Sequence, residues 1–317
     1  MLNLTLLGSG GGMPMPDRFL SSLLLNYHGR KILVDCGEGT QVAMRKFNTG
    51  FKSIDVICIT HTHGDHIFGL PGLLSTIGNS ERTDPITIIG PIGITKVIEG
   101  LMVAINYLPF DVHIIESPRS PLDLVISSNR LHIKNLDYSA KIEMSISTIE
   151  LDHSSPCIGY SFYLYRRPKF QIEKAKKNNV PREIWTKLQN GETVILNDKS
   201  YEPSMVLGEE REGIKLSYIT DTRPIETISN FINRSDLFIC EGTYGEDEDL
   251  NKAVKNKHMT FTEAGELARN GDVGELLLTH FSPALDNPEL YKLNVKSVFK
   301  DVTIGFDGLV KTLSFEG

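Results

Sequence analysis

The heptapeptide "THTHGDH" at residues 60–66 holds three histidines and one aspartate, and it directly follows the apolar run "IDVICI" at residues 54–59. The apolar run has the length and the β-branched content of a buried strand. Side chains alternate between the two faces of an extended segment, so His61 and His63 point to the same side. Gly64 permits a sharp turn, which brings the next two polar side chains round to the same place. The stretch therefore predicts a strand that ends in a cluster of polar side chains.

A metal ion explains this cluster better than ordinary polar surface does. A single histidine near a strand end is usually structural, but three within six positions, together with Asp65, are costly to desolvate without a cation. Imidazole and carboxylate groups are ligands of zinc and, less strictly, of manganese or iron. Four ligands from one loop do not complete two metal sites, so the remaining ligands must come from elsewhere in the chain.

Three other polar residues follow strand-like runs in the same way as His61. His153 follows "MSISTIEL", Asp221 follows "KLSYIT", and His280 ends "ELLLTH". Strand ends at one edge of a sheet share a crevice, so these residues are the expected additional ligands. Three further histidines have no such setting and are interpreted as structural: His28, His113 and His132.

Composition narrows the class of protein. The chain has 317 residues, and 33 Lys and Arg against 40 Asp and Glu give a net charge of −7, which excludes a strongly basic protein that binds nucleic acid indiscriminately. A chain of this length can bury a core without structural metals, so a metal is expected to serve chemistry. The four cysteines are far apart and form no CxxC pair, which argues against a disulfide framework and a thiolate zinc site. Without a basic leader or a run of 18 apolar residues, the chain is predicted to be cytoplasmic and to have no membrane span.

Short apolar runs outnumber helical patterns along the chain. Helices are expected at residues 39–47, 70–78 and 260–271, where Thr260 or Thr262 is the candidate cap of the last one. Helices fall between some strands and not others, which favours two packed sheets with helices outside over one doubly wound sheet. We therefore predict an α+β fold with residues 1–317 in a single domain.

One segment differs from the rest in charge. Residues 166–187 hold eight lysines and arginines against two glutamates, and they include Trp185, the single tryptophan of the chain. We interpret the segment as part of a basic, arm-like insertion at about residues 166–200. The alternative is a solvated charged excursion without a binding role.

Several segments along the chain resemble one known family. They resemble, in order and over nearly the whole chain, the motifs of the ribonuclease Z family, the short-form tRNA 3′-processing endonucleases of the metallo-β-lactamase superfamily. The segments are "LTLLGSGGGMP", "DCGEGTQ", "ITHTHGDHIFGLPGLL", "IGP", "YITDTRP", "CEGTY" and "LLLTHFSP". The resemblance implies the αββα sandwich of that superfamily, with two packed mixed β-sheets and helices outside. It also implies two Zn²⁺ per subunit, with Mn²⁺ or Fe²⁺ as alternatives.

The resemblance also implies roles for individual residues. One zinc is expected to be held by His61, His63 and His153, the second by Asp65, His66 and His280, with Asp221 bridging the two. Asp65 is expected to accept the proton of the attacking water, and His258 to assist proton transfer to the leaving oxygen. Glu241 is expected to orient His258, and Asp35 to act as a carboxylate behind the ligands or as a turn former. Met259 replaces a small residue of the family.

The expected activity is a zinc-dependent endoribonuclease that removes the 3′ trailer from tRNA precursors. The resemblance implies that a hydroxide activated by two metals attacks, leaving a 3′-hydroxyl on the tRNA and a 5′-phosphate on the trailer. It further implies a homodimer in which the arm grips the tRNA. The candidate substrate contacts are Arg18, Arg166, Arg167, Lys169, Lys174, Lys176, Lys177 and Arg182. No nucleotide cofactor is expected, because "GSGGG" at residues 8–12 lacks the third glycine of a dinucleotide motif and a clear helix after it.

Two departures from the family keep alternatives open. The substrate loop reads Pro14-Met15-Pro16-Asp17-Arg18-Phe19, without the lysine and asparagine of the family, and Val180-Pro181-Arg182-Glu183 replaces a Pro-Pro-Gly-Pro of the arm. One alternative is a di-metal phosphodiesterase or other ester hydrolase that acts on small substrates. Another is a nucleic-acid binder with a structural metal. The seven expected ligands speak against it, because a closed structural zinc site needs only four.

Overall fold

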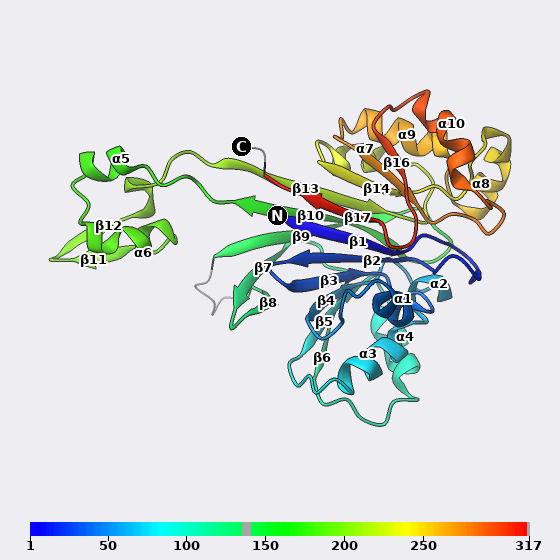
Figure 1. The fold of residues 1–317 in the computed structure, drawn as a ribbon, viewed down its shortest axis with the longest axis horizontal. Coiled ribbons are helices and arrows are strands. Elements are labelled where there is room, and N and C mark those ends of the chain that lie inside the picture. Colours follow the sequence, from blue (N-terminus) through cyan, green and yellow to red (C-terminus); the bar gives the residue numbers. More distant parts are fainter. Residues whose placement is uncertain (135–140, 316–317) are drawn as a thin grey trace.

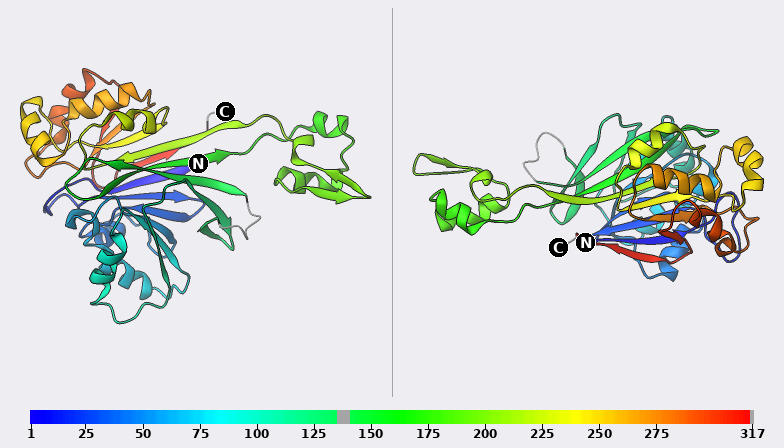
Figure 2. Two further views of the ribbon diagram at one scale, coloured as in Figure 1. Left: turned by 180° about the vertical axis from the view of Figure 1, so that it is seen from behind. Right: turned by 90° about the horizontal axis from the view of Figure 1, so that it is seen from above.

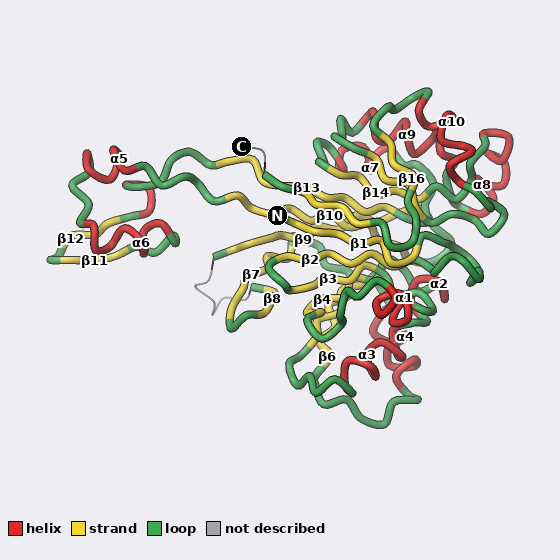
Figure 3. The backbone as a smooth tube through the Cα atoms, viewed as in Figure 1, coloured by secondary structure: helices red, strands yellow, loops and turns green. Residues whose placement is uncertain are grey.

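The fold is a sandwich of four layers, in which helices cover the outer face of each of two sheets (Figures 1 and 2). The structure is a computed structural model, and it describes residues 1–134 and 141–315. Both sheets are mixed, with parallel and antiparallel neighbours. The tube view shows their strands in yellow and the helices outside them in red (Figure 3). Among the described residues, no helix combines the length and the apolar character needed to cross a membrane.

The first sheet has the strand order β17-β1-β2-β3-β4-β5-β6 within the described chain. The neighbours from β17 to β3 are antiparallel, and those from β3 to β6 are parallel. Its strands are β1 (Leu2–Gly8), β2 (Ser22–Tyr27), β3 (Arg30–Val34), β4 (Ile54–Cys58), β5 (Ile86–Gly90), β6 (Val112–Glu116) and β17 (Val310–Leu313).

The second sheet has the order β16-β15-β14-β13-β10-β9-β7-β8 over the same described ranges. The neighbours from β16 to β13 are parallel, and those from β13 to β8 are antiparallel. Its strands are β7 (Leu122–Ser127), β8 (Arg130–Ile133), β9 (Ile142–Leu151), β10 (Cys157–Arg166), β13 (Arg211–Ile219), β14 (Leu237–Glu241), β15 (Leu276–Thr279) and β16 (Val302–Ile304).

Three apolar cores hold the layers together. One lies between the two sheets, a second joins the first sheet to α1, α3 and α4, and a third joins the second sheet to α7, α9 and α10. The helices of the body are α1 (Thr40–Lys46), α2 (Gly64–Ile67), α3 (Leu70–Gly78), α4 (Ile94–Met102), α7 (Glu226–Ile232), α8 (Leu250–Asn256), α9 (Phe261–Asn270) and α10 (Lys292–Lys296). Two short 3₁₀ helices complete the body, η3 (Asp247–Asp249) and η4 (Pro288–Tyr291).

The segment between β10 and β13 projects from the body as an arm (Figure 1). It has its own small core, which includes Ala175, Val180, Leu188 and Val206. Its elements are α5 (Ile172–Lys177), η1 (Arg182–Ile184), α6 (Trp185–Gln189), β11 (Val194–Leu196), β12 (Lys199–Tyr201) and η2 (Pro203–Met205). The helical half of the arm carries the basic excess, whereas residues 188–210 hold one lysine against five acidic residues.

The three helices expected from the sequence are present. Of the two candidate caps, Thr260 caps α9: its hydroxyl accepts from the Glu263 backbone, and the Glu263 carboxylate accepts from the Thr260 backbone. The apolar run at residues 302–310 has the length of a single strand, but the structure does not form one there. The run divides into β16 and the start of β17, which belong to different sheets, and Gly308 adopts a φ of 89° in the connection between them.

A buried carboxylate ties both sheets together far from the cluster of histidines. Asp55 accepts from the Arg30 guanidinium, from Arg82 Nη2 at 3.1 Å and from the Leu131 backbone at 2.9 Å. The Asp55 side chain is fully buried, and the two guanidinium groups are nearly so. These contacts join β3, β4 and the loop before β5 to β8 of the second sheet.

Replacing Asp55 with asparagine is expected to lower the free energy of unfolding by about 3–5 kcal/mol, because Arg30 and Arg82 lose their buried counter-charge. Urea unfolding of wild type and variant measures the change. Glu212→Gln is the control, since it breaks an ion pair to Arg234 whose side chains are exposed, and it should change stability little. Equal stability of Asp55→Asn and wild type would contradict this role.

Candidate metal centre

The polar side chains singled out in the sequence lie at one edge of the sandwich, where several strands end. Asp35 follows β3, His61 follows β4, His153 follows β9, Asp221 follows β13 and His280 follows β15. The chain direction is the same in the parallel members of each sheet, so these residues gather from both sheets at a common edge.

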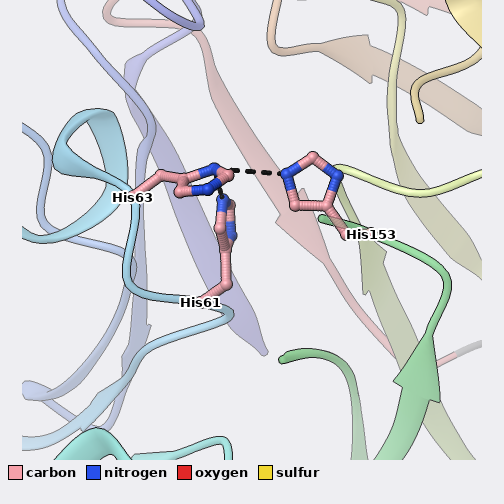
Figure 4. Close-up of side chains that lie close together, drawn as sticks. All are labelled: His61, His63 and His153. Atoms are coloured by element: carbon pink, nitrogen blue, oxygen red, sulfur yellow. Dashed lines mark hydrogen bonds between the residues drawn. The ribbon is translucent and has the colours of Figure 1, made fainter. Parts of the chain in front are cut away.

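Three histidines form the first group of donors (Figure 4). His63 Nδ1 lies 3.0 Å from His61 Nε2 and 3.2 Å from His153 Nε2. His61 and His63 come from the loop after β4, and His153 comes from the opposite sheet. The ring nitrogens converge on one point between the two sheets.

Asp65, His66 and His280 form the second group. His66 Nε2 lies 3.1 Å from His280 Nε2, and Asp65 Oδ2 lies 3.4 Å from each of these nitrogens. Gly12 N donates to the same Asp65 oxygen at 2.6 Å. A side chain at Gly11 would place its Cβ 2.3 Å from His280 Cε1, so only glycine lets this loop approach the ring.

Asp221 lies between the two groups. Its Oδ2 is 3.1 Å from His66 Nε2 and 3.2 Å from His280 Nε2, and the same residue forms a possible ligand set with His61 and His66. Burial raises the pKa of Asp221, but the histidines around it outweigh burial and hold the pKa well below its usual value. The carboxylate is therefore ionised and can serve both groups.

The donor set fits divalent cations. Neighbouring donors around a tetrahedral zinc are about 3.3 Å apart when each zinc–nitrogen bond is about 2.0–2.1 Å. His63 lies 3.0 and 3.2 Å from the two other histidines of the first group, and the separations within the second group are 3.1–3.4 Å. A neutral imidazole has one N–H, so ring nitrogens that face each other at this distance compete for protons without a cation. A cation between them removes that conflict.

In four of the histidine rings, the nitrogen that faces away from the donor group contacts an oxygen. This arrangement is usual for histidines that bind metals. His66 Nδ1 contacts Asp35 Oδ2 at 2.8 Å, and His153 Nδ1 contacts the Lys257 carbonyl at 3.2 Å. His61 Nδ1 lies 3.1 Å from Thr60 Oγ1, and His280 Nδ1 lies 3.2 Å from Thr243 Oγ1. These contacts turn the inner nitrogens toward the two groups.

Strained backbone supports the arrangement. Asp35, Asp221 and His280 have φ angles of 58°, 53° and 56°, in the left-handed region that residues other than glycine adopt at a cost. Asp35 also accepts from the backbone and the hydroxyl of Thr60. It therefore contacts His66 and Thr60 from a left-handed backbone position directly after β3.

His258 and Glu241 lie beside the second group. His258 Nδ1 is 3.2 Å from Glu241 Oε2 and 3.6 Å from Asp221 Oδ1. Glu241 is fully buried and also accepts from the backbones of Thr222 and Met259. Burial lowers the pKa of His258, but the carboxylates of Glu241 and Asp221 outweigh burial and raise it to about 9. His258 is therefore protonated near neutral pH, with Nε2 not engaged by Glu241.

The predicted substrate contacts differ in their surroundings. Arg18 donates to the carbonyls of Ser282, Leu285 and Asp286, so its guanidinium braces the loop after His280. Arg166 stacks on Phe315, and Arg167 pairs with Glu143 of the body.

Of the arm residues, Lys174 donates to the Leu207 carbonyl, Lys176 pairs with Glu173, and Arg182 stacks on Trp185. Lys169, Lys177 and Lys187 are exposed, and within the described chain their side chains make no hydrogen bond or ion pair.

The cleft at the centre has a volume of about 380 Å³, and part of its wall was not anticipated from the sequence. Lys255, Asn256 and Lys257 line it from the end of α8 and the residue that follows. Their position next to His258 was the available signal. Within the described residues, the groups of donors do not include His28, His113 or His132.

Known proteins resemble the chain over its full length. It is 63% identical over 316 residues to ribonuclease Z of Alkaliphilus oremlandii, with all of both chains covered. Human tRNase Z, short form, is 25% identical with a TM-score of 0.66, over 99% of this chain and 100% of that one. The metallo-β-lactamase fold protein YhfI of Bacillus subtilis is 19% identical with a TM-score of 0.67, over 98% of each chain.

These likenesses confirm the predicted fold of two mixed sheets with helices outside. A family model described as anti-Pycsar protein Apyc1 matches residues 2–98, a stretch that contains the "THTHGDH" loop but less than half of the chain.

Proposed function

The chain belongs to the ribonuclease Z family, and we propose that it removes the 3′ trailer from tRNA precursors with two divalent cations, preferably zinc. The observation that carries the proposal is the pair of donor groups joined by Asp221, in which the ring nitrogens converge and their far sides are held by oxygens. Such a double site suits phosphodiester cleavage, because two cations can stabilise both the attacking and the leaving oxygen.

Each residue has a place in the proposed centre. His61, His63 and His153 would hold one cation and Asp65, His66 and His280 would hold the other, with Asp221 placed to serve both. When bound, the cations lower the pKa of water and offset the charge that develops on the phosphate. Mn²⁺ or Fe²⁺ is the alternative to zinc with these nitrogen and oxygen donors.

The protein side chains then handle the protons. Asp65, oriented by Gly12 N, takes the proton of the water that attacks phosphorus. As the bond from phosphorus to the 3′ oxygen breaks, His258 gives its proton from Nε2 to that oxygen, while Glu241 holds Nδ1. The tRNA leaves with a 3′-hydroxyl and the trailer with a 5′-phosphate.

The arm provides the proposed contact to the tRNA body. Lys169, Lys177 and Lys187 are its exposed cations without a partner in the described residues. Contacts of this kind position nucleic acid and carry no sequence information.

We also propose that the protein acts as a homodimer, to be tested by light scattering after size exclusion.

The cytoplasm is the proposed location. The four cysteines are buried, and none is paired with another. Unpaired thiols are usual in a reducing compartment. The oxidation state of these thiols, measured after extraction with a reagent that blocks free thiols, tests the proposed location.

Metal removal tests the central proposal. Purified protein should cleave a precursor tRNA at the trailer junction, lose that activity in chelator and regain it when Zn²⁺ is added, because the donors then recover their cations. Bis(p-nitrophenyl) phosphate serves as a parallel substrate. Turnover of this ester without tRNA cleavage would instead support a hydrolase of small phosphodiesters.

The pH dependence of kcat tests the role of Glu241. Glu241→Gln removes the negative charge that favours the protonated form of His258, so the pKa of His258 should fall from about 9 toward 6.5. The descending alkaline limb of kcat should therefore move to lower pH. If the alkaline limb lies at the same pH in wild type and Glu241→Gln, proton donation by His258 is refuted. Glu212→Gln is the control, because it removes a carboxylate at an exposed site.

The arm is tested by replacing Lys169, Lys177 and Lys187 with alanine together. Removing three phosphate contacts should raise KM for precursor tRNA and reduce the salt slope of binding by about 2–3. Hydrolysis of bis(p-nitrophenyl) phosphate should not change. The control replaces Lys199, which stacks on Tyr201 of the acidic half. Unchanged salt dependence would show that these lysines do not meet the RNA.

A further inference from the structure

We propose that Lys255, at the end of α8, binds the RNA phosphate that lies one nucleotide to the 5′ side of the cleaved one. This inference rests on the proposed function, since it names the part of the same substrate that a further residue of the cleft binds. The residue is not a proposed metal ligand and does not take part in proton transfer.

The end of α8 faces the metal centre. Lys255, Asn256 and Lys257 line the cleft together with His258. The His258 backbone donates to the Ala253 carbonyl at 2.9 Å, and Lys257 has a φ of 59°, which reverses the chain between the helix and His258. The backbone that carries Lys255 is therefore anchored next to the proposed proton donor.

Lys255 is the free cation of this cleft. Lys257 Nζ pairs with Asp152 Oδ1 at 2.6 Å, so its charge is already matched. Arg18, on the loop that also carries Gly12, donates to backbone carbonyls. Lys255 is exposed, and within residues 1–134 and 141–315 its side chain makes neither a hydrogen bond nor an ion pair. An ammonium at the rim of a phosphodiester site, without a counter-charge, is suited to bind a phosphate.

The neighbouring contacts keep this rim in place. Asn256 Nδ2 donates to Tyr244 Oη at 2.7 Å, and the Tyr244 ring packs edge-on against the His258 ring, with 6.5 Å between the ring centres. The end of α8, which carries Lys255, and the His258 ring are thus linked through one tyrosine.

The direction of the RNA follows from the chemistry. His258 protonates the 3′ oxygen of the last nucleotide that stays on the tRNA, so that nucleotide lies next to His258. The next phosphate on that side is the 5′-phosphate of the same nucleotide. Lys255 lines the same cleft as His258 and is placed to bind this phosphate.

A structural role is the alternative. Lys255 is in the last turn of α8, where a cation also stabilises the carbonyl end of a helix. That role would affect stability and every substrate alike, whereas a phosphate contact affects only substrates that have a second phosphate.

The first experiment compares Lys255→Ala, Lys255→Arg and Lys252→Ala with wild type. Lys252 is the matched control, because it lies on the same helix, pairs with Asp249 and is outside the lining of the cleft. For precursor tRNA, Lys255→Ala should raise KM about tenfold with little change in kcat and reduce the salt slope by about 1. Lys255→Arg should restore KM, and Lys252→Ala should behave as wild type. Turnover of bis(p-nitrophenyl) phosphate should be the same in all four proteins.

The second experiment locates the phosphate. A neutral methylphosphonate replaces either the 5′-phosphate of the last retained nucleotide or a phosphate two nucleotides into the trailer. The first substitution should raise KM for wild type but have no further effect on Lys255→Ala, because both changes remove one contact. The second should affect both enzymes equally.

Several outcomes would overturn the inference. They are an unchanged KM in Lys255→Ala, additive effects of the variant and the first methylphosphonate, or a joint loss of thermal stability and of ester turnover. If wild type itself fails to cleave precursor tRNA, the proposed function fails first. If wild type cleaves and Lys255→Ala equals it, only the role of Lys255 fails.

Discussion

The close approach of the seven proposed donor side chains depends on oxygen atoms that contact the opposite side of the histidine rings. The Asp35 carboxylate, two threonine hydroxyls and the Lys257 carbonyl contact the outer nitrogens of four histidines. The inner nitrogens are then 3.0–3.2 Å from one another, an arrangement that protons alone do not satisfy. A cation is the partner that this geometry lacks, and the proposed chemistry depends on it.

The same constraint explains why the site needs the whole sandwich. One loop after β4 supplies four of the donors, while His153, Asp221 and His280 come from strand ends of the second sheet. Apolar packing between the sheets therefore sets the distance between the two halves of each ligand group. Left-handed backbone at Asp221 and His280 is tolerated because surrounding contacts fix it.

The sequence was most informative where local order determines position. The alternation after β4 and the polar residues at strand ends were sufficient to bring the donors to one edge. The sequence was less informative where contacts between residues far apart in the chain determine the position of a side chain or strand. Nothing local indicates that Arg18 turns onto the carbonyls of Ser282 and Leu285, or that Lys255 reaches the cleft through the left-handed turn at Lys257. The split of residues 302–310 between two sheets likewise depends on partners distant in the chain.

The distribution of charge reconciles a net charge of −7 with an RNA substrate. The basic excess is confined to the helical half of the arm, and the return half at residues 188–210 is acidic. At the centre, the acidic side chains are Asp35, Asp65, Asp221 and Glu241, and two divalent cations would offset their negative charge. RNA would then be attracted at two separate places, the arm and the loaded cleft, and repelled by much of the remaining surface. Such a pattern selects substrates that span both places, which a small ester cannot do.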